Sequence, residues 1–134
     1  MANMLYTKAK EKILQGQINL LTDDIRVAIV SNAYVQSMTT DEFLSAVSAN
    51  ILGTPMALTG RSITGGAFDG DDLNFTGIAS GATTEGVVIY KDTGNPATSP
   101  LIYYADTVTG FPMLTSGGAV EVRWDNGAYK IFSL

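Results

Sequence analysis

The second half of the chain consists of short β-type segments that are separated by turns. From Arg61 onward the candidate strands fall at about 61–68, 72–79, 85–91, 101–107, 119–124 and 128–133. Gly, Pro, Asn and Asp concentrate between them, and this spacing is typical of an antiparallel sandwich or barrel. Segment 85–91 is the most apolar, which predicts a central strand. Segment 92–100 has too many turn residues to form a strand, so 101–104 is expected to return antiparallel.

The N-terminal region combines a predicted helix with a predicted strand. Between Met4 and Gln15 an apolar residue recurs every four positions, which indicates a short amphipathic helix. Gly16 follows directly and is suited to end that helix. After a turn, segment 25–30 alternates β-branched side chains onto one face, and this pattern predicts a strand.

The middle of the chain predicts a second helix and then an irregular segment. Thr39 and Glu42 are three residues apart and fit a capping box, which is expected to open a short helix through about Val47. Segment 49–60 contains Pro55, two glycines and no charge, and is expected to be an extended loop or an irregular strand.

These elements predict a mainly β protein. With 134 residues, the chain is expected to form a single domain over residues 1–134. Residues 1–16 would form an N-terminal arm or helix, and residues 25–134 a β-rich body. The predicted architecture is an antiparallel β-sandwich or barrel with a short N-terminal helix and one short inserted helix.

The last two segments are expected to form a hairpin. The Asn-Gly pair at 126–127 is the preferred dipeptide of a two-residue type I′ turn. In that register Trp124 would lie opposite Tyr129, and Val122 opposite Ile131. The resulting apolar stripe would be buried in the core.

The chain has few charged residues, and they are unevenly distributed. Charged residues make up 16% of the sequence, against about 25% in ordinary soluble domains. No charged residue lies within 27–40, 43–60, 93–105 or 107–120. Charge is depleted in the cores of protein interfaces, so this pattern favours a protein whose surface is covered by neighbours in an assembly.

The distribution of charge also argues against several partners. The net charge is −5, and Lys8, Lys10 and Lys12 form the only basic cluster, so nucleic acid is not an expected partner. The lysines could bind an anionic partner, but a solvated helix face is the favoured interpretation. No apolar run is long enough to span a membrane. The first residues lack the pattern of a signal peptide, so export is not expected.

The residue types leave little room for catalysis. The chain has no His and no Cys, so a Ser or Cys nucleophile activated by His is excluded. Asp92-Thr93-Gly94 matches the triplet of aspartic proteases, but its sequence context and the missing second triplet favour a β-turn. We therefore expect no enzyme, no catalytic residue and no cofactor.

Two further groups of side chains could form binding sites. Segment 69–72 concentrates three aspartates beside a glycine, which could bind a cation or form an exposed turn. We favour the turn and expect no metal site. Tyr103 and Tyr104 are adjacent, so on a strand they point to opposite faces and cannot form one sugar-stacking platform. Aromatic packing in the core is the favoured interpretation.

Several segments of the chain, in their joint order, resemble a known family. These are 1–10, 18–30, 40–44, 58–61, 88–94, 99–103 and 124–132. In this order they are similar to small structural proteins encoded in the virion gene clusters of tailed double-stranded DNA bacteriophages. The resemblance implies a virion component, and most specifically a capsid decoration, or cement, protein that binds the major capsid protein lattice and stabilises the head.

The resemblance carries further expectations. The partner would be the major capsid protein, and a homo-oligomer, a trimer, is expected. The protein would lie on the capsid exterior, after assembly in the bacterial host cytoplasm. Met4, Leu5 and Tyr6 are the expected contact residues. The alternatives are another virion component (tail, neck, baseplate or fibre base) or a virion-displayed carbohydrate- or receptor-binding module, which would need an exposed aromatic pair.

Overall fold

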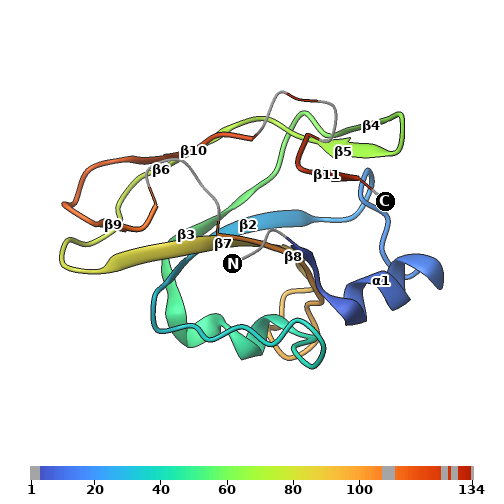
Figure 1. Cartoon of the computed structure of the whole chain (residues 1–134), viewed down its shortest axis with the longest axis horizontal. Coiled ribbons are helices and arrows are strands. Elements are labelled where there is room, and N and C mark those ends of the chain that lie inside the picture. Colours follow the sequence, from blue (N-terminus) through green and yellow to red (C-terminus); the bar gives the residue numbers. More distant parts are fainter. Residues whose placement is uncertain (1–3, 107–110, 125–126, 128–129, 134) are drawn as a thin grey trace.

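The computed structural model describes residues 4–106, 111–124, 127 and 130–133. Its main sheet is antiparallel, with the strand order β1-β8-β7-β2-β3. The strands are β1 (Met4–Leu5), β8 (Leu101–Ala105), β7 (Thr83–Lys91), β2 (Ile25–Ser31) and β3 (Ile51–Ala57). A short strand, β9 (Met113–Leu114), pairs with the first part of β7. The sheet runs through the middle of the molecule (Figure 1).

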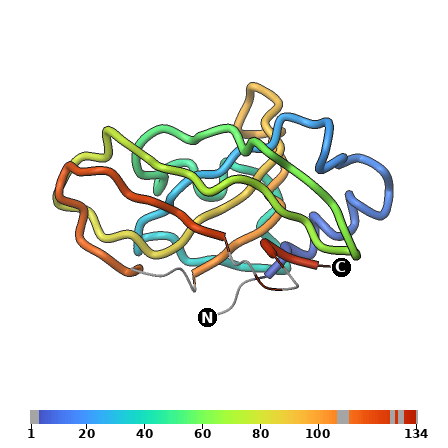
Figure 2. The backbone as a smooth tube through the Cα atoms, turned by 90° about the horizontal axis from the view of Figure 1, so that it is seen from above, coloured from blue at the N-terminus to red at the C-terminus, as the bar shows by residue number. Residues whose placement is uncertain are grey.

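Two small sheets cover one face of the main sheet (Figures 1 and 2). One pairs β6 (Leu73–Phe75) with β10 (Val120–Val122), and the other has the order β11-β5-β4. Its strands are β4 (Ser62–Thr64), β5 (Ala67–Asp69) and β11 (Phe132–Ser133). On the opposite face lie helix α1 (Thr7–Leu14) and two 3-10 turns, η1 (Leu44–Ala46) and η2 (Ser48–Asn50). The fold is therefore mainly β and sandwich-like, as predicted.

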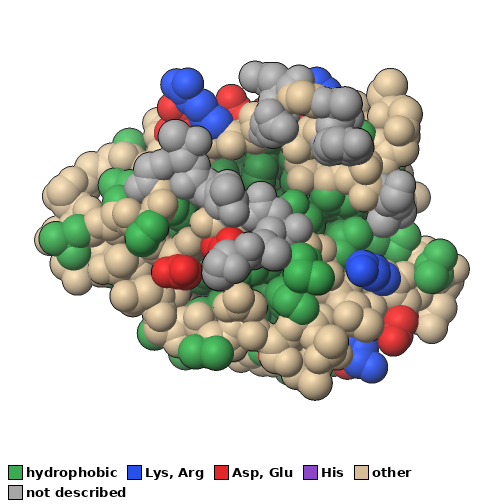
Figure 3. All heavy atoms as spheres, viewed as in Figure 1, with side chains coloured by type: hydrophobic (Ala, Val, Ile, Leu, Met, Phe, Trp, Pro, Cys, Tyr) green, Lys and Arg blue, Asp and Glu red, His purple; other side chains and the backbone are tan. Residues whose placement is uncertain are grey.

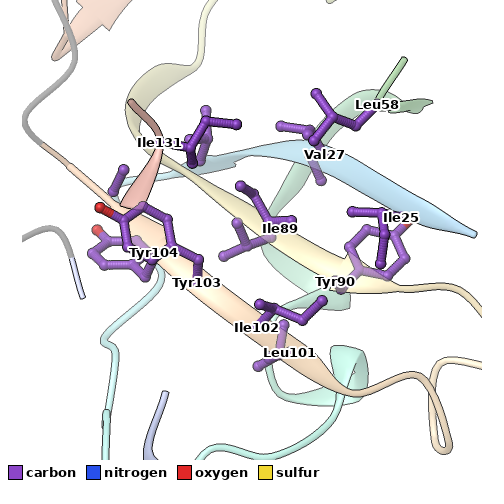
Figure 4. Close-up of a cluster of buried hydrophobic side chains, with 14 of the residues drawn as sticks. Ile25, Val27, Leu58, Ile89, Tyr90, Leu101, Ile102, Tyr103, Tyr104 and Ile131 are labelled. Atoms are coloured by element: carbon purple, nitrogen blue, oxygen red, sulfur yellow. The ribbon is translucent and has the colours of Figure 1, made fainter. Parts of the chain in front are cut away.

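The core lies on both faces of the central strands. Segment 25–30 forms β2, and segment 85–91 forms most of β7, which pairs with β2, β8 and β9 as a central strand. Val27 lies opposite Ile89, which in turn lies opposite Tyr103. All of these side chains are buried, and they belong to the packed cluster shown in Figure 4. The apolar side chains that predicted these two strands are therefore buried on both faces of the sheet.

The N-terminal helix was predicted correctly, but it begins at Thr7 rather than at Met4. Tyr6 is extended (φ −65°, ψ 142°) and its N–H donates to Ile102 O at 3.0 Å. Met4 and Leu5 consequently form β1, which pairs with Tyr104 and Tyr103. The helix ends near Gly16, whose φ of +76° is the left-handed conformation expected of a helix stop.

The helix predicted over 39–47 was wrong. Phe43 is extended and bridges to Pro100, while Leu44 N donates to Ser99 O at 2.8 Å. Because this backbone is paired with segment 99–101, only the short 3-10 turns follow. Glu42 contacts Lys12 Nζ instead of completing a capping box.

Segment 49–60 contains an irregular strand, as was expected. This strand, β3, lies at one edge of the main sheet. Between Val27 and Ile29 the β2–β3 register shifts. The shift coincides with Gly53, which has φ +71°, and with Pro55 nearby. A positive φ favours glycine, and a proline lacks the N–H that would extend a ladder of hydrogen bonds.

The C-terminal strands pair differently from the prediction. Segment 61–68 is interrupted by Gly65 and Gly66, which connect β4 to β5, and 72–79 contributes only the short β6. The prediction that the strands on either side of 126–127 pair with each other is wrong. Instead, β10 pairs with β6, and β11 pairs with β5. Val122 therefore lies opposite Leu73 rather than Ile131. Asn126 and Tyr129 lie outside the described residues.

The bonds of Trp124 explain the different pairing. Its backbone N–H donates to Asp72 Oδ1 at 2.9 Å and its indole N–H donates to Asp71 O at 2.9 Å. These bonds attach the end of β10 to the loop before β6. No helix among the described residues is long and apolar enough to cross a membrane.

Candidate interaction surface

Two of the three predicted contact residues are buried within the chain itself. Met4 is 41% exposed, but Leu5 is 8% and Tyr6 is 0% exposed. The Tyr6 hydroxyl lies 2.8 Å from the Tyr34 hydroxyl. The expectation is therefore corrected, since Leu5 and Tyr6 serve the core of this fold and Met4 alone presents substantial surface.

Asp92 belongs to a turn and an ion-pair network. Its Oδ1 accepts a hydrogen bond from Gly94 N at 3.1 Å, as in an Asx turn. Arg26 lies between two carboxylates, at 3.2 Å from Asp24 and 3.4 Å from Asp92. Each carboxylate is thus paired with a cation, whereas the aspartic protease chemistry requires two carboxylates that share a proton.

The aspartates of segment 69–72 anchor loops. Asp71 Oδ2 accepts from Thr59 Oγ1 at 3.0 Å, and Asp72 Oδ1 accepts from the backbone of Trp124. Among the described residues, no group of three or more His, Cys, Asp or Glu is arranged to hold a metal ion. The turn interpretation accounts for these bonds.

The adjacent tyrosines point to opposite faces, as predicted. The ring of Tyr103 lies 5.0 Å from that of Phe132 in one layer, and the ring of Tyr104 lies 5.7 Å from that of Tyr34 in the other. Both tyrosines are buried, and burial raises the pKa of Tyr103 to about 12. These two residues therefore do not form the exposed aromatic pair that a carbohydrate-binding module would need.

Uncharged segments meet at one end of the molecule. We call this end the neutral end and define it as residues 31–35, 51–54, 76–84 and 111–119, which contain no Asp, Glu, Lys or Arg. Ser31 pairs with Thr84, and Asn32 N donates to Thr83 O at 3.0 Å. Val30 pairs with Ile51, which joins the end of β2 to the start of β3.

The loop 76–82 and β9 complete the neutral end. A Cβ added at Gly53 would lie 2.8 Å from Ile78 Cγ1, so β3 and this loop are in close contact. Gly81 N donates to Thr115 O at 3.0 Å. In Figure 3 the left-hand tip of the molecule is tan and green, blue side chains lie along the top and at the lower right, and red side chains lie between the tip and the centre. Glu85, which follows Thr84 and is half-buried, marks the inner limit of the neutral end.

Two buried threonines fix β9 in position. Thr84 Oγ1 accepts from Met113 N at 3.1 Å and lies 3.3 Å from Met113 O, to which it donates. Thr115 Oγ1 donates to Ala79 O at 2.7 Å and accepts from Ala82 N at 3.0 Å. Thr84 and Thr115 are 0% and 3% exposed. The backbone on both sides of Leu114 is therefore anchored.

Leu114 itself faces water. It is 67% exposed, although both of its chain neighbours are held by buried hydroxyl groups. No strand was predicted at 113–114, and the only sign of this surface in the sequence is the absence of charge over 107–120. The anchoring depends on contacts between distant segments, which no local pattern predicts.

The opposite end of the sheet carries ion pairs. Lys91 Nζ lies 3.2 Å from Asp23 Oδ2, and the Arg61 guanidinium donates to the carbonyls of Leu20 and Asp23. Burial alone would raise the pKa of Asp23, but the hydrogen bond from Asn19 N and the charge of Lys91 outweigh it and lower the pKa. These ion pairs thus lie at the other end of β2 from the neutral end.

The chain matches no protein-family model and no curated protein.

Proposed function

We propose that this chain is a structural protein of a tailed-bacteriophage virion, and specifically a decoration protein that binds the major capsid protein lattice on the capsid exterior. Assembly would take place in the cytoplasm of the bacterial host. The family resemblance of the sequence supplies the class of protein. The observation that carries the proposal is the neutral end, because it brings four uncharged segments of the chain, 31–35, 51–54, 76–84 and 111–119, onto one surface.

A surface of this kind suits permanent coverage by neighbours. Burying a charged side chain costs several kcal/mol unless it is paired, and covering the neutral end buries none. Leu114 adds apolar area that a neighbour would remove from water, and its anchored backbone has little freedom left to lose. Many identical sites on a shell would add avidity to each weak contact.

The decisive experiment measures where the protein is and how much of it is present. Purified particles of the bacteriophage that encodes the chain are analysed by quantitative mass spectrometry and by electron microscopy. We expect a copy number comparable to that of the major shell protein, and a lattice-repeating density on the head of one 14.2 kDa chain per copy. A few copies confined to the tail would refute decoration, and absence from the particle would refute any virion role.

A gene deletion provides the control. Particles that lack the protein should assemble with the same shell but should lose the repeating density, and they should break at lower temperature or lower osmotic stress. Restoring the purified chain should restore both the density and the resistance.

A further inference from the structure

β9 lies at the edge of the main sheet, within the neutral end. Thr84 of β7 pairs with Ser31 of β2 and with Met113 of β9, so β9 is on the side of β7 away from β2. It is found at the left-hand end of the molecule in Figure 1. Leu114, the second residue of this strand, is 67% exposed.

The backbone of Leu114 points away from β7. Thr83, the residue opposite it, accepts at its carbonyl from Asn32 N at 3.0 Å and thus faces β2. Thr115 N donates to Ala82 O at 2.7 Å, toward β7. Successive residues of an antiparallel strand direct their backbone groups to alternate sides. The N–H and C=O of Leu114 are therefore directed outward, and no described residue bonds to them.

Other margins of the main sheet are irregular or covered. In β3, at the opposite margin, Gly53 has φ +71° and Pro55 has no N–H to offer. β8, on the same side of β7 as β9, is paired with β1, and Leu101 N donates to Glu42 O at 2.9 Å. β9 differs from both, because an outward backbone pair lies there beside an exposed leucine. Such an edge is suited to accept another strand.

We infer that β9 binds the shell by strand addition. An extended, uncharged segment of the major capsid protein pairs with the outer edge of β9, and its backbone bonds to the N–H and C=O of Leu114. This inference rests on the proposed function, which assigns the neutral end to the shell, and it names the chemistry of the contact. Main-chain bonds hold the segment, and the Leu114 side chain packs against apolar side chains of the segment.

The absence of charge determines which segment fits. The four segments that form the neutral end contain no Asp, Glu, Lys or Arg. A charged side chain on the added strand would therefore lose water without gaining an ion pair, which is costly. A strand of Ser, Thr, Gly and apolar residues meets no such cost, so the contact selects for a neutral segment of the shell.

β9 is already held in place for this contact. Thr84 Oγ1 accepts from Met113 N at 3.1 Å, and Thr115 Oγ1 donates to Ala79 O at 2.7 Å. Both neighbours of Leu114 are thus fixed in the free chain. Because ordering a mobile segment lowers affinity, only the segment of the shell has to be ordered when the two strands pair.

The first test is amide hydrogen exchange of the full chain, free and bound to particles that lack their own copy. We expect the Leu114 amide to exchange rapidly in the free chain and to be protected on the particle. The Thr115 amide is the internal control, because it bonds to Ala82 O and should be protected in both states. A Leu114 amide that exchanges equally fast in both states overturns the inference.

Proline variants test the same bond by affinity. Leu114→Pro removes the N–H at an edge position where proline is tolerated, and it should weaken binding to these particles at least about tenfold. Leu114→Val keeps the N–H and should lose much less. Ile63→Pro is the matched control, because Ile63 is 48% exposed in β4, a strand at the edge of a small sheet outside the neutral end. It should bind as the wild type does.

Circular dichroism and thermal unfolding check that each variant keeps the fold. Wild-type affinity of a folded Leu114→Pro, or an equal loss in a folded Ile63→Pro, contradicts strand addition at β9. Electron microscopy of decorated particles then identifies the partner. We expect a strand of the major capsid protein about 4.7–4.9 Å from β9. A strand from a second copy of this chain at that place, or no strand at all, overturns the inference.

The failure of this inference is distinguishable from that of the proposed function. If the chain covers the shell while the Leu114 amide stays unprotected, the proposed function stands and strand addition is wrong. If the chain is absent from the particles, the copy number shows it before any exchange is measured. The proposed function then fails, and the inference that rests on it fails with it.

Discussion

The hydroxyl of Tyr6 lies 2.8 Å from the hydroxyl of Tyr34, which donates to Asp41 Oδ2 at 2.7 Å. This buried relay joins β1 to the segment between β2 and η1. It helps to hold the junction of β1 and α1, where Tyr6 has no exposed surface, against that segment. A hydrogen bond to a charged group is among the stronger polar contacts in proteins.

Removing the central hydroxyl should therefore weaken the fold. Tyr34→Phe leaves the buried Tyr6 hydroxyl without its partner, and we expect the free energy of unfolding to fall by about 1–3 kcal/mol. Urea denaturation followed by circular dichroism measures this loss. An unchanged midpoint would show that the relay does not stabilise the chain.

Tyr104→Phe should have the opposite effect. The Tyr104 hydroxyl is buried and has no hydrogen-bond partner among the described residues, so its removal eliminates a desolvation cost without breaking a bond. We expect stability to be equal to the wild type or greater by about 1 kcal/mol. Tyr34→Phe is the natural comparison, and a loss as large as in that variant would contradict the interpretation.

Alkaline pH should unfold the protein through its buried tyrosines. Burial raises the pKa of Tyr90, Tyr103 and Tyr104 from the ordinary 10.0 to about 12. The unfolded chain then loses these protons at lower pH than the folded chain. The stability that the neutral phenols contribute is complete below pH 10 and is lost as the pH rises toward 12.

Two measurements check this dependence. Denaturant unfolding at a series of pH values should give a free energy that falls above pH 10, the ordinary pKa of tyrosine. Ultraviolet absorbance should report delayed ionisation in the folded chain. Ionisation of all tyrosines at their ordinary pKa, with the fold intact, would refute the burial that the structure assigns to them.

Gly86 is required by the close approach of β8. A Cβ at this position would lie 2.4 Å from the backbone oxygen of Ala105, which cannot move without disturbing the central pairing. We expect Gly86→Ala to destabilise the chain by about 1–3 kcal/mol. Gly118→Ala is the control, because its nearest neighbour would be Ser116 Oγ at 3.7 Å. Its effect should stay within about 0.5 kcal/mol, and equal melting temperatures for the two variants would contradict the prediction.

The sequence predicted those elements that depend on local pattern. Alternating β-branched residues identified β2, the apolar character of segment 85–91 identified β7, and turn residues identified the connection at 92–100. β1 was missed because a strand of two residues is defined by its partner, β8, rather than by its own side chains. The Asn-Gly signal at 126–127 did not produce the expected strand pairing, because Trp124 bonds to segment 71–72 and β10 pairs with β6.

The candidate surface was predictable only in part. The uncharged stretches were visible in the sequence, but their meeting at one end depends on the register of β2 with β7 and β3, and of β7 with β9. Leu114 became distinctive only through Thr84 and Thr115, which lie far apart in the chain. Residues 4–6 were expected to contact a partner, yet the packing of the chain buries Leu5 and Tyr6.

The irregular course of β3 limits how copies of this chain can meet. A regular, uncharged strand at the margin of a sheet is a template for another strand, and such growth has no natural end. Gly53 bends β3 with its positive φ, and Pro55 offers no N–H to an incoming chain. On the capsid lattice that we propose, where many copies would lie close together, this edge would protect them from fibril formation.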